Sequence, residues 1–172
     1  MAKELSGAVK ALIAITPLPT TNENEVKKLS QQVSTWNNDT ALATTTAAAE
    51  QVAIVARQAC RLVGARFAPG AAVTGAATNF FTLLIAKRPA TAPGTPVNLI
   101  TYAADTATTD DVAAFAARDL LAAATLATYV PTATGNDFDL EEGDVLTIAV
   151  TKAGSGMTFP ISAVSLMLEP RT

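Results

Sequence analysis

The sequence contains no histidine and a single cysteine, Cys60, among its 172 residues. The absence of histidine removes the most frequent general base and the most frequent metal ligand of enzymes. One cysteine excludes a disulfide within the chain. Cys60 is interpreted as a small buried apolar residue, because no histidine is present to activate its thiol. The sequence therefore predicts no catalytic site, no metal site and no cofactor.

Charged and aromatic side chains are also scarce. Only 16% of residues are charged and 5% are aromatic, and 12 basic and 15 acidic residues give a net charge of −3. This balance offers no basic surface for nucleic acid or for an anionic membrane. No apolar run reaches the roughly 20 residues that a membrane-spanning helix needs. We expect one domain, with or without an extension, that packs against a partner.

Residues 1–50 are predicted to form an N-terminal arm. Asn22 and Glu25 have the spacing of a capping box. Four apolar residues then recur at intervals of three and four, which predicts a short amphipathic helix over about residues 22–36. These residues are Val26, Leu29, Val33 and Trp36. The stripe fits either a helix lying on its own domain or a self-association segment, and a Thr/Ala-rich linker over residues 37–50 follows it.

Residues 51–172 are predicted to form a β domain. Short apolar or alternating runs are separated by Gly- and Pro-rich turns about every ten residues. The clearest predicted strands lie at about residues 52–57, 60–67, 79–87, 97–102, 145–151 and 161–168. Residues 112–128 have helical propensity, but two strands are favoured there because the neighbouring elements are β. The predicted fold is a mainly β, antiparallel β-sandwich of jelly-roll type, with a small barrel as the alternative.

The densest charge in the chain is a set of five carboxylates, namely Asp137, Asp139, Glu141, Glu142 and Asp144. They lack the spacing of a helix–loop–helix calcium site. A solvated turn is therefore favoured, in which Asp144 accepts hydrogen bonds from nearby backbone amides, with calcium as the alternative. Asp110 and Asp111 are interpreted as a polar loop, because consecutive side chains of an extended chain point to opposite sides. The segment Gly154-Ser155-Gly156 is interpreted as a hairpin turn, since it lacks the lysine and helix of a phosphate-binding loop.

Basic residues are interpreted in two groups. Arg57, Arg61 and Arg66 fall near one predicted strand pair, and we expect them to meet an acidic partner surface, because the guanidinium group is favoured at such interfaces. Lys87 and Arg88 end a strand just before a proline and are interpreted as edge charges. Two cations are too few to form a nucleic-acid groove.

Three segments in the same order carry a family resemblance. They are FAPGAAVTGAATNFFTLLIAKR at residues 67–88, LEEGDVLTIAV at 140–150 and AGSGMTFPISAVSLMLEP at 153–170. Together they resemble the tailed-bacteriophage capsid decoration or head-fibre proteins, a family of small virion proteins. The resemblance covers about residues 50–170 and leaves the arm unmatched. It implies a β-sandwich on the outside of the phage head, often in trimers, without catalytic residues.

This resemblance implies a non-enzymatic virion structural protein, made in the host cytoplasm, that decorates or cements the outer capsid surface. Its expected partners are the major capsid protein or another virion protein and further copies of itself, with a trimer preferred and neither nucleic acid nor membrane bound. The stripe over residues 26–36 is the expected self-association or capsid-docking segment. The alternatives are a phage tail or fibre component and a carbohydrate- or receptor-binding β-sandwich. Sugar binding is less favoured, because the few aromatic residues are scattered along the sequence. An enzyme is the weakest hypothesis, because the sequence shows no histidine and no nucleophile–base pair.

Overall fold

The computed structural model describes residues 31–43, 48–106, 110–121 and 138–171. From Gln32 onwards these residues belong to one compact unit. They contain strands and no helix, which confirms the expected mainly β, antiparallel character. The strands are β1 (Gln32–Asn38), β2 (Ala48–Val55), β3 (Cys60–Pro69), β4 (Phe80–Arg88), β5 (Val97–Ala103), β6 (Arg118–Asp119), β7 (Asp139–Leu140), β8 (Val145–Ala153) and β9 (Ser162–Pro170).

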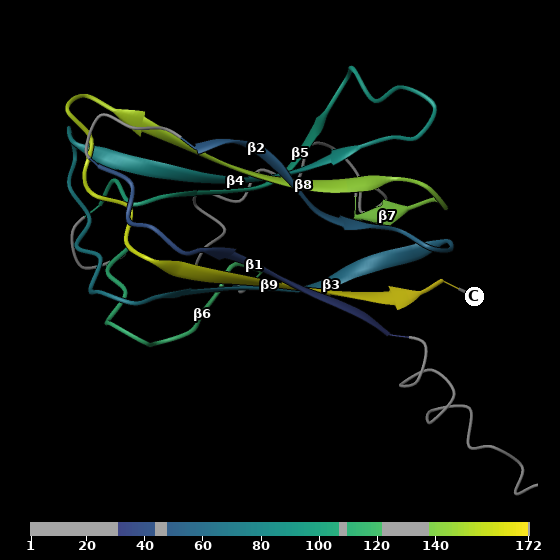
Figure 1. The fold of residues 1–172 in the computed structure, drawn as a ribbon, viewed down its shortest axis with the longest axis horizontal. Coiled ribbons are helices and arrows are strands. Elements are labelled where there is room, and N and C mark those ends of the chain that lie inside the picture. The colour runs from purple at the N-terminus through teal and green to yellow at the C-terminus, as the bar shows by residue number, and fades with distance from the viewer. Residues whose placement is uncertain (1–30, 44–47, 107–109, 122–137, 172) are drawn as a thin grey trace, which may run out of the picture. The chain divides into compact units, whose positions relative to one another are not determined.

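The strands form two antiparallel sheets that pack face to face (Figure 1). The β9 sheet has the order β1-β9-β3-β6, and β7 also pairs with β3. The β8 sheet has the order β2-β8-β4-β5. Along the chain, β1 to β4 alternate between the two sheets, β5 stays beside β4 in the β8 sheet, and β6 returns to the β9 sheet.

An aromatic core fills the space between the sheets. Phe67 and Phe81 contact each other, and each also contacts Tyr102 and Phe159, with ring centroids 4.8 to 6.3 Å apart. Aliphatic side chains at alternate positions of the central strands surround these rings and are also fully buried. The alternation follows from the two-residue period of a strand, which directs every second side chain towards the opposite sheet.

The helix predicted over residues 22–36 is wrong for residues 32–36, which belong to β1, and residues 22–30 lie outside the described residues. β1 pairs with β9 along its whole length, from Gln32 to Asn38, without a register shift. The side chains of β1 alternate between exposed and partly or fully buried positions, and Trp36 is the fully buried one. Pairing with β9 and burial of Trp36 outweigh the helical spacing of the apolar residues.

The predicted boundary near residue 50 falls inside the compact unit. β1 is a full member of the β9 sheet, and the following segment is attached through Leu42, whose N–H donates to the carbonyl oxygen of Phe159 over 2.8 Å. The domain therefore includes part of the predicted arm and its linker.

Two further predictions concern connections. Of the two strands favoured in residues 112–128, the described residues show only the two-residue β6 and a single bridge between Val112 and Val73, and residues 122–128 lie outside them. The segment Gly154-Ser155-Gly156 is a turn but not a hairpin, because β8 and β9 belong to different sheets. It begins the crossing from one sheet to the other. The described residues contain no helix that could span a membrane.

Candidate functional site

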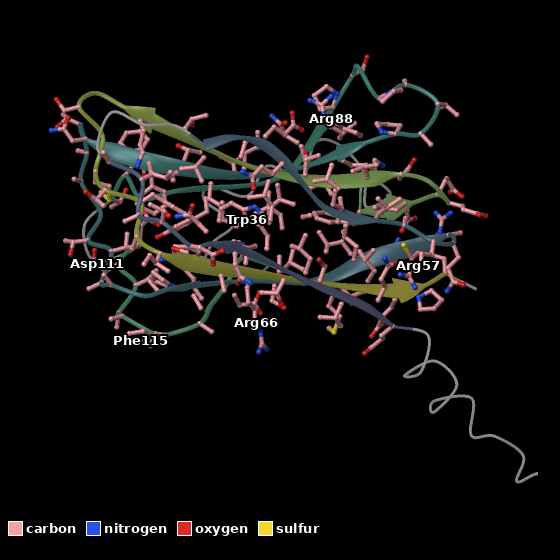
Figure 2. All side chains as sticks on the ribbon, in the orientation of Figure 1. Trp36, Arg57, Arg66, Arg88, Asp111 and Phe115 are labelled. Carbon is pink, nitrogen blue, oxygen red and sulfur yellow. The ribbon has the colours of Figure 1, made fainter. Side chains whose placement is uncertain are left out.

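The predicted association stripe does not form one face. Val26 and Leu29 lie outside the described residues. Val33 is 59% exposed on the outer face of the β9 sheet, whereas Trp36 is only 8% exposed and points between the sheets (Figure 2). Three residues apart on a strand, the two side chains must point to opposite faces. Trp36 is therefore a core residue of the domain.

The inward side chains of β1 close one edge of the domain. The indole N–H of Trp36 donates to Gln51 Oε1 over 2.7 Å. Ser34 Oγ donates to the carbonyl oxygen of Ala53 over 2.6 Å, and Gln32 Nε2 donates to that of Val55 over 2.7 Å. These bonds satisfy carbonyl groups at the edge of β2 that no neighbouring strand pairs within the described residues.

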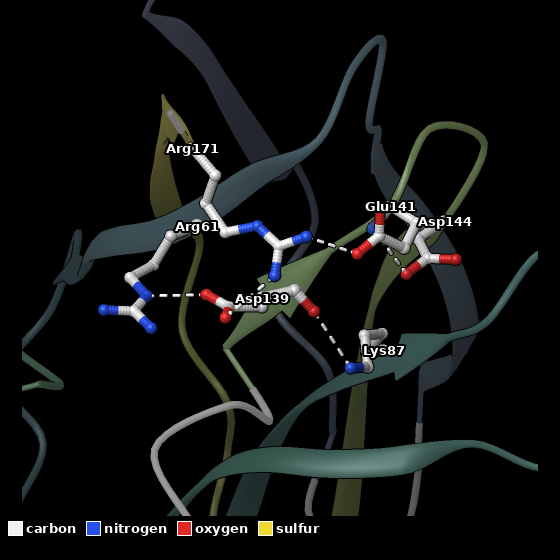
Figure 3. Close-up of polar contacts among 6 residues, drawn as sticks. All are labelled: Arg61, Lys87, Asp139, Glu141, Asp144 and Arg171. Carbon is white, nitrogen blue, oxygen red and sulfur yellow. Dashed lines mark hydrogen bonds and ion pairs between the residues drawn. The ribbon is translucent and has the colours of Figure 1, made fainter.

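Ion pairs organise the predicted acidic cluster (Figure 3). Arg61 Nε lies 2.6 Å from Asp139 Oδ1, and the guanidinium of Arg171 contacts both Asp139 Oδ2, at 2.9 Å, and Glu141. Hydrogen bonding to Arg61 lowers the pKa of Asp139. Lys87 adds a hydrogen bond to the backbone oxygen of Asp139 over 3.0 Å. Arg61 thus pairs within its own chain rather than standing free for an acidic partner.

Asp144 has the role predicted for it. Its carboxylate accepts hydrogen bonds from the backbone N–H of Ala90, at 2.8 Å, and of Glu141, at 3.0 Å. The side chain thus fixes the turn that leads into β8. The interpretation as a structural turn is confirmed for this residue, whereas Asp137 lies outside the described residues.

A polar pocket of about 600 Å³ lies beside these residues at one end of the domain, and Glu142 also lines it. Asp139, Glu141 and Asp144 are each engaged by a guanidinium or a backbone amide. Within the described ranges, no three potential metal ligands come together. The pocket is consistent with a structural role for the cluster.

Asp110 and Asp111 point to different surroundings, as predicted. Asp110 is buried, pairs with Arg118 at 3.4 Å and accepts a hydrogen bond from the backbone of Thr106. Arg118 also lies over the ring of Tyr102, and burial raises the pKa of that tyrosine to about 12. Asp111 is exposed and accepts a hydrogen bond from the N–H of Gly75 over 2.8 Å. Both carboxylates hold loops in place.

The remaining residues chosen from the sequence also have structural settings. Cys60 is buried, which confirms its interpretation as a small buried residue, and burial raises the pKa of its thiol. Arg88 holds both carboxylate oxygens of Glu50 on the outer face of the β8 sheet. Arg57 and Arg66 are exposed, and Figure 2 shows them at separate places on the domain.

Sequence reasoning missed the most conspicuous surface residue, Phe115. Its side chain is 84% exposed, more than any other large apolar side chain in the described residues. Its φ angle is 60°, in the left-handed region that aromatic residues rarely adopt. The backbone N–H donates to the carbonyl oxygen of Pro69 over 2.7 Å, which holds the loop in this conformation. The only signal in the sequence was a lone phenylalanine between alanines.

A shallow groove of about 320 Å³ connects Phe115 with Ile161, which is 54% exposed. We call Phe115, Ile161 and this groove the Phe115 surface. The ends of β3 and β9 form its floor, and Gly70 permits their close approach, because a Cβ there would lie 3.0 Å from the carbonyl oxygen of Ile161. Asn37 and Asp39 line the groove as polar members. The surface is suited to covering by an apolar group of a partner.

Comparison of the chain with protein-family models, with curated proteins and with solved structures finds no match.

Proposed function

We propose that this protein is a non-enzymatic structural protein of a tailed-phage virion, and that it binds the outer surface of the head through the Phe115 surface. The observation that carries the proposal is Phe115 itself. A phenylalanine that is 84% exposed gains no free energy from burial. Holding a non-glycine residue in the left-handed region also lowers the stability of the fold, by about 1–3 kcal/mol. The exposure is explained if a partner covers the side chain, and the left-handed backbone, held by the bond to Pro69, keeps the side chain available to that partner.

The architecture supports the same proposal. The resemblance implies a β-sandwich, and the spacing of the predicted strands favours a jelly-roll type. In a jelly roll, one long antiparallel ribbon is wrapped so that its strand pairs are nested. The pairs β1–β9, β2–β8, β3–β6 and β4–β5 are nested in this way. Such a domain exposes loops and sheet ends to a partner while its core stays rigid.

Binding to an assembled shell supplies a mechanism without catalysis. A protein that binds the assembled shell and not its free subunits stabilises that shell by mass action. Attachment of many copies that bridge neighbouring subunits adds avidity. The resemblance implies a trimer as the bound form and the major capsid protein, or another virion protein, as the partner.

A second candidate is carbohydrate binding, and one observation favours it. Phe115 stands beside Asn37 and Asp39 in the same groove, and a sugar ring stacks on an aromatic face while its hydroxyl groups bond to amide and carboxylate side chains. Trp36 and Tyr102 are buried, so neither contributes to such a site. A glycan screen that compares the wild type with Phe115→Asn tests this candidate directly.

The proposal is tested by co-sedimentation of the full-length protein with undecorated heads of the phage that encodes it. We expect saturable binding of the wild type, and at least a tenfold loss of affinity in Phe115→Asn, because truncation of an interface hot spot costs about 2 kcal/mol or more. Asparagine tolerates the left-handed conformation, so this variant keeps the loop. The matched control is Val52→Asn, which removes an exposed apolar side chain from β2 and should bind like the wild type.

Two results would contradict the proposal. One is a wild type that fails to bind heads at any concentration. The other is a Phe115→Asn variant that binds as well as the wild type, since the contact would then lie elsewhere on the molecule.

A further inference from the structure

The four sheet edges of the domain differ in how well they are protected against pairing with another chain. β2 carries two one-residue irregularities, and side chains of β1 bind its carbonyl oxygens. β5 follows Pro96 and has one extra residue, Leu99, where its register with β4 shifts. β6 and β7 have only two residues each. Bulges, prolines, short strands and covering side chains are the usual devices that prevent edge-to-edge association.

Among the residues that the structure describes, β1 has none of these devices. Its seven residues, QVSTWNN, include no charge, no proline and no glycine, and its pairing with β9 shows no irregularity. On the side away from β9, no strand of the described residues pairs with it. Its inward side chains are held by β2, so the strand is already fixed in an extended conformation. An edge of this kind accepts an additional strand with little loss of conformational entropy.

We propose that β1 pairs in antiparallel fashion with β1 of a second copy of this chain, with the two-fold axis at Thr35. The two β9 sheets then form one continuous sheet across the dimer. Thr35 is the middle residue of Gln32–Asn38, so this register pairs all seven residues of both strands.

The side chains of β1 suit pairing with their own copy. The register places Thr35 opposite the partner's Thr35 and Val33 opposite the partner's Asn37. Threonine pairs and β-branched residues are favourable across strands, and like charges directly opposite are unfavourable. A two-fold axis brings identical residues together, and the absence of charge on β1 removes this repulsion. Asp39, just beyond the strand, falls opposite the partner's Gln31, so the two carboxylates stay far apart.

The pairing has a consequence that rests on the proposed function. A two-fold axis between antiparallel strands is perpendicular to their sheet, so both outer faces of the β9 sheet point the same way. Figure 2 shows Phe115 on the side of this sheet that faces away from the β8 sheet. Both Phe115 surfaces of the dimer then face one target, and binding becomes bivalent. The pairing itself is measured without any target, so its failure is distinguishable from a failure to bind heads.

The test is sedimentation equilibrium of the full-length chain at increasing concentration. We expect the wild type to have twice the monomer mass of 17.6 kDa. Thr35→Lys places two ammonium groups opposite each other on the axis and should raise the dissociation constant several-fold. Thr35→Glu should do the same, and an equimolar mixture of the two variants should recover the dimer through an opposite-charge pair. The control is Val52→Lys, at an exposed position of β2, which should remain dimeric.

Thr35 is exposed, so these variants are expected to fold, and circular dichroism checks this. A monomeric wild type would overturn the proposal. So would the trimer that the family resemblance implies, because strand pairing about this axis closes with two copies and the two oligomers are alternatives. A dimer that persists in Thr35→Lys would also overturn it. If the β1 edge instead binds an extended segment of another protein, the wild type alone is monomeric, and the proposal of self-pairing is overturned.

Discussion

At the scale of single residues, side chains with a local role were predicted better than side chains with a role at the surface. The burial of Cys60 follows from its apolar character. The turn-forming role of Asp144 follows from its bond to the nearby N–H of Glu141, whereas its bond to the distant Ala90 could not be read from the sequence. Trp36 was assigned to a helix because its spacing from Val33 fits a helical stripe, and the tertiary partner Gln51 that fixes its true setting is invisible in the sequence. Phe115 was missed because neither exposure nor a positive φ can be read from a lone phenylalanine.

Glu50 provides a residue-scale prediction on pH. Hydrogen bonds from Arg88 and Thr147 lower the pKa of Glu50 from 4.5 to about 2. The folded state therefore favours the ionised carboxylate, and this stabilisation is fully present above pH 4.5 and is lost as the pH falls towards 2.

We expect Glu50→Gln to lower the melting temperature at pH 7 by at most about 2–4 °C. An exposed ion pair contributes up to about 1 kcal/mol to the free energy of unfolding, which corresponds to this shift for a chain of this size. The difference from the wild type should shrink as the pH falls from 4.5 to 2. Thermal unfolding followed by circular dichroism measures both values, with Glu142→Gln, at an exposed position, as the control. A difference that stays constant across this pH range would show that Glu50 acts through packing rather than through its charge.

At the scale of elements, alternation located most of the long strands of the domain. β3, β4, β5, β8 and β9 lie close to their predicted positions, because apolar side chains alternate with polar or small ones and turn residues mark the ends. β1 was missed because its alternating pattern overlaps the end of an apparent helical stripe. The order in which strands pair within each sheet could not be predicted, because it depends on contacts between segments far apart in the chain.

The turn after β8 gives an element-scale prediction. Gly154 has a φ angle of 58°, and a Cβ at this position would overlap the carbonyl oxygen of Thr78. Gly154→Ala should therefore destabilise the domain by more than the ~1–2 kcal/mol that the left-handed conformation alone costs. The matched control is Gly94→Ala in the β4–β5 connection, where a Cβ would meet nothing within 4 Å. Chemical denaturation of both variants measures the difference, and equal stabilities would contradict the assigned turn geometry.

At the scale of the whole molecule, the described residues form a two-sheet domain in which the β1 edge lacks protecting features and Phe115 marks one exposed apolar surface. The polar groups weighed as chemical sites are engaged in ion pairs and turns that stabilise the fold. The sequence predicted the fold class because composition and alternation extend along the chain. It did not predict the Phe115 surface, which forms only where the ends of β3 and β9 meet a loop between β5 and β6.

The most direct measurement is hydroxyl-radical footprinting of the protein, free and bound to phage heads, read out by mass spectrometry. We expect oxidation of Phe115 to fall several-fold on binding, because a side chain that is 84% exposed becomes covered. Val52, which is 64% exposed on the other sheet, should be oxidised to the same extent in both states. Unchanged oxidation of Phe115 in saturated complexes would contradict the claim that this surface docks.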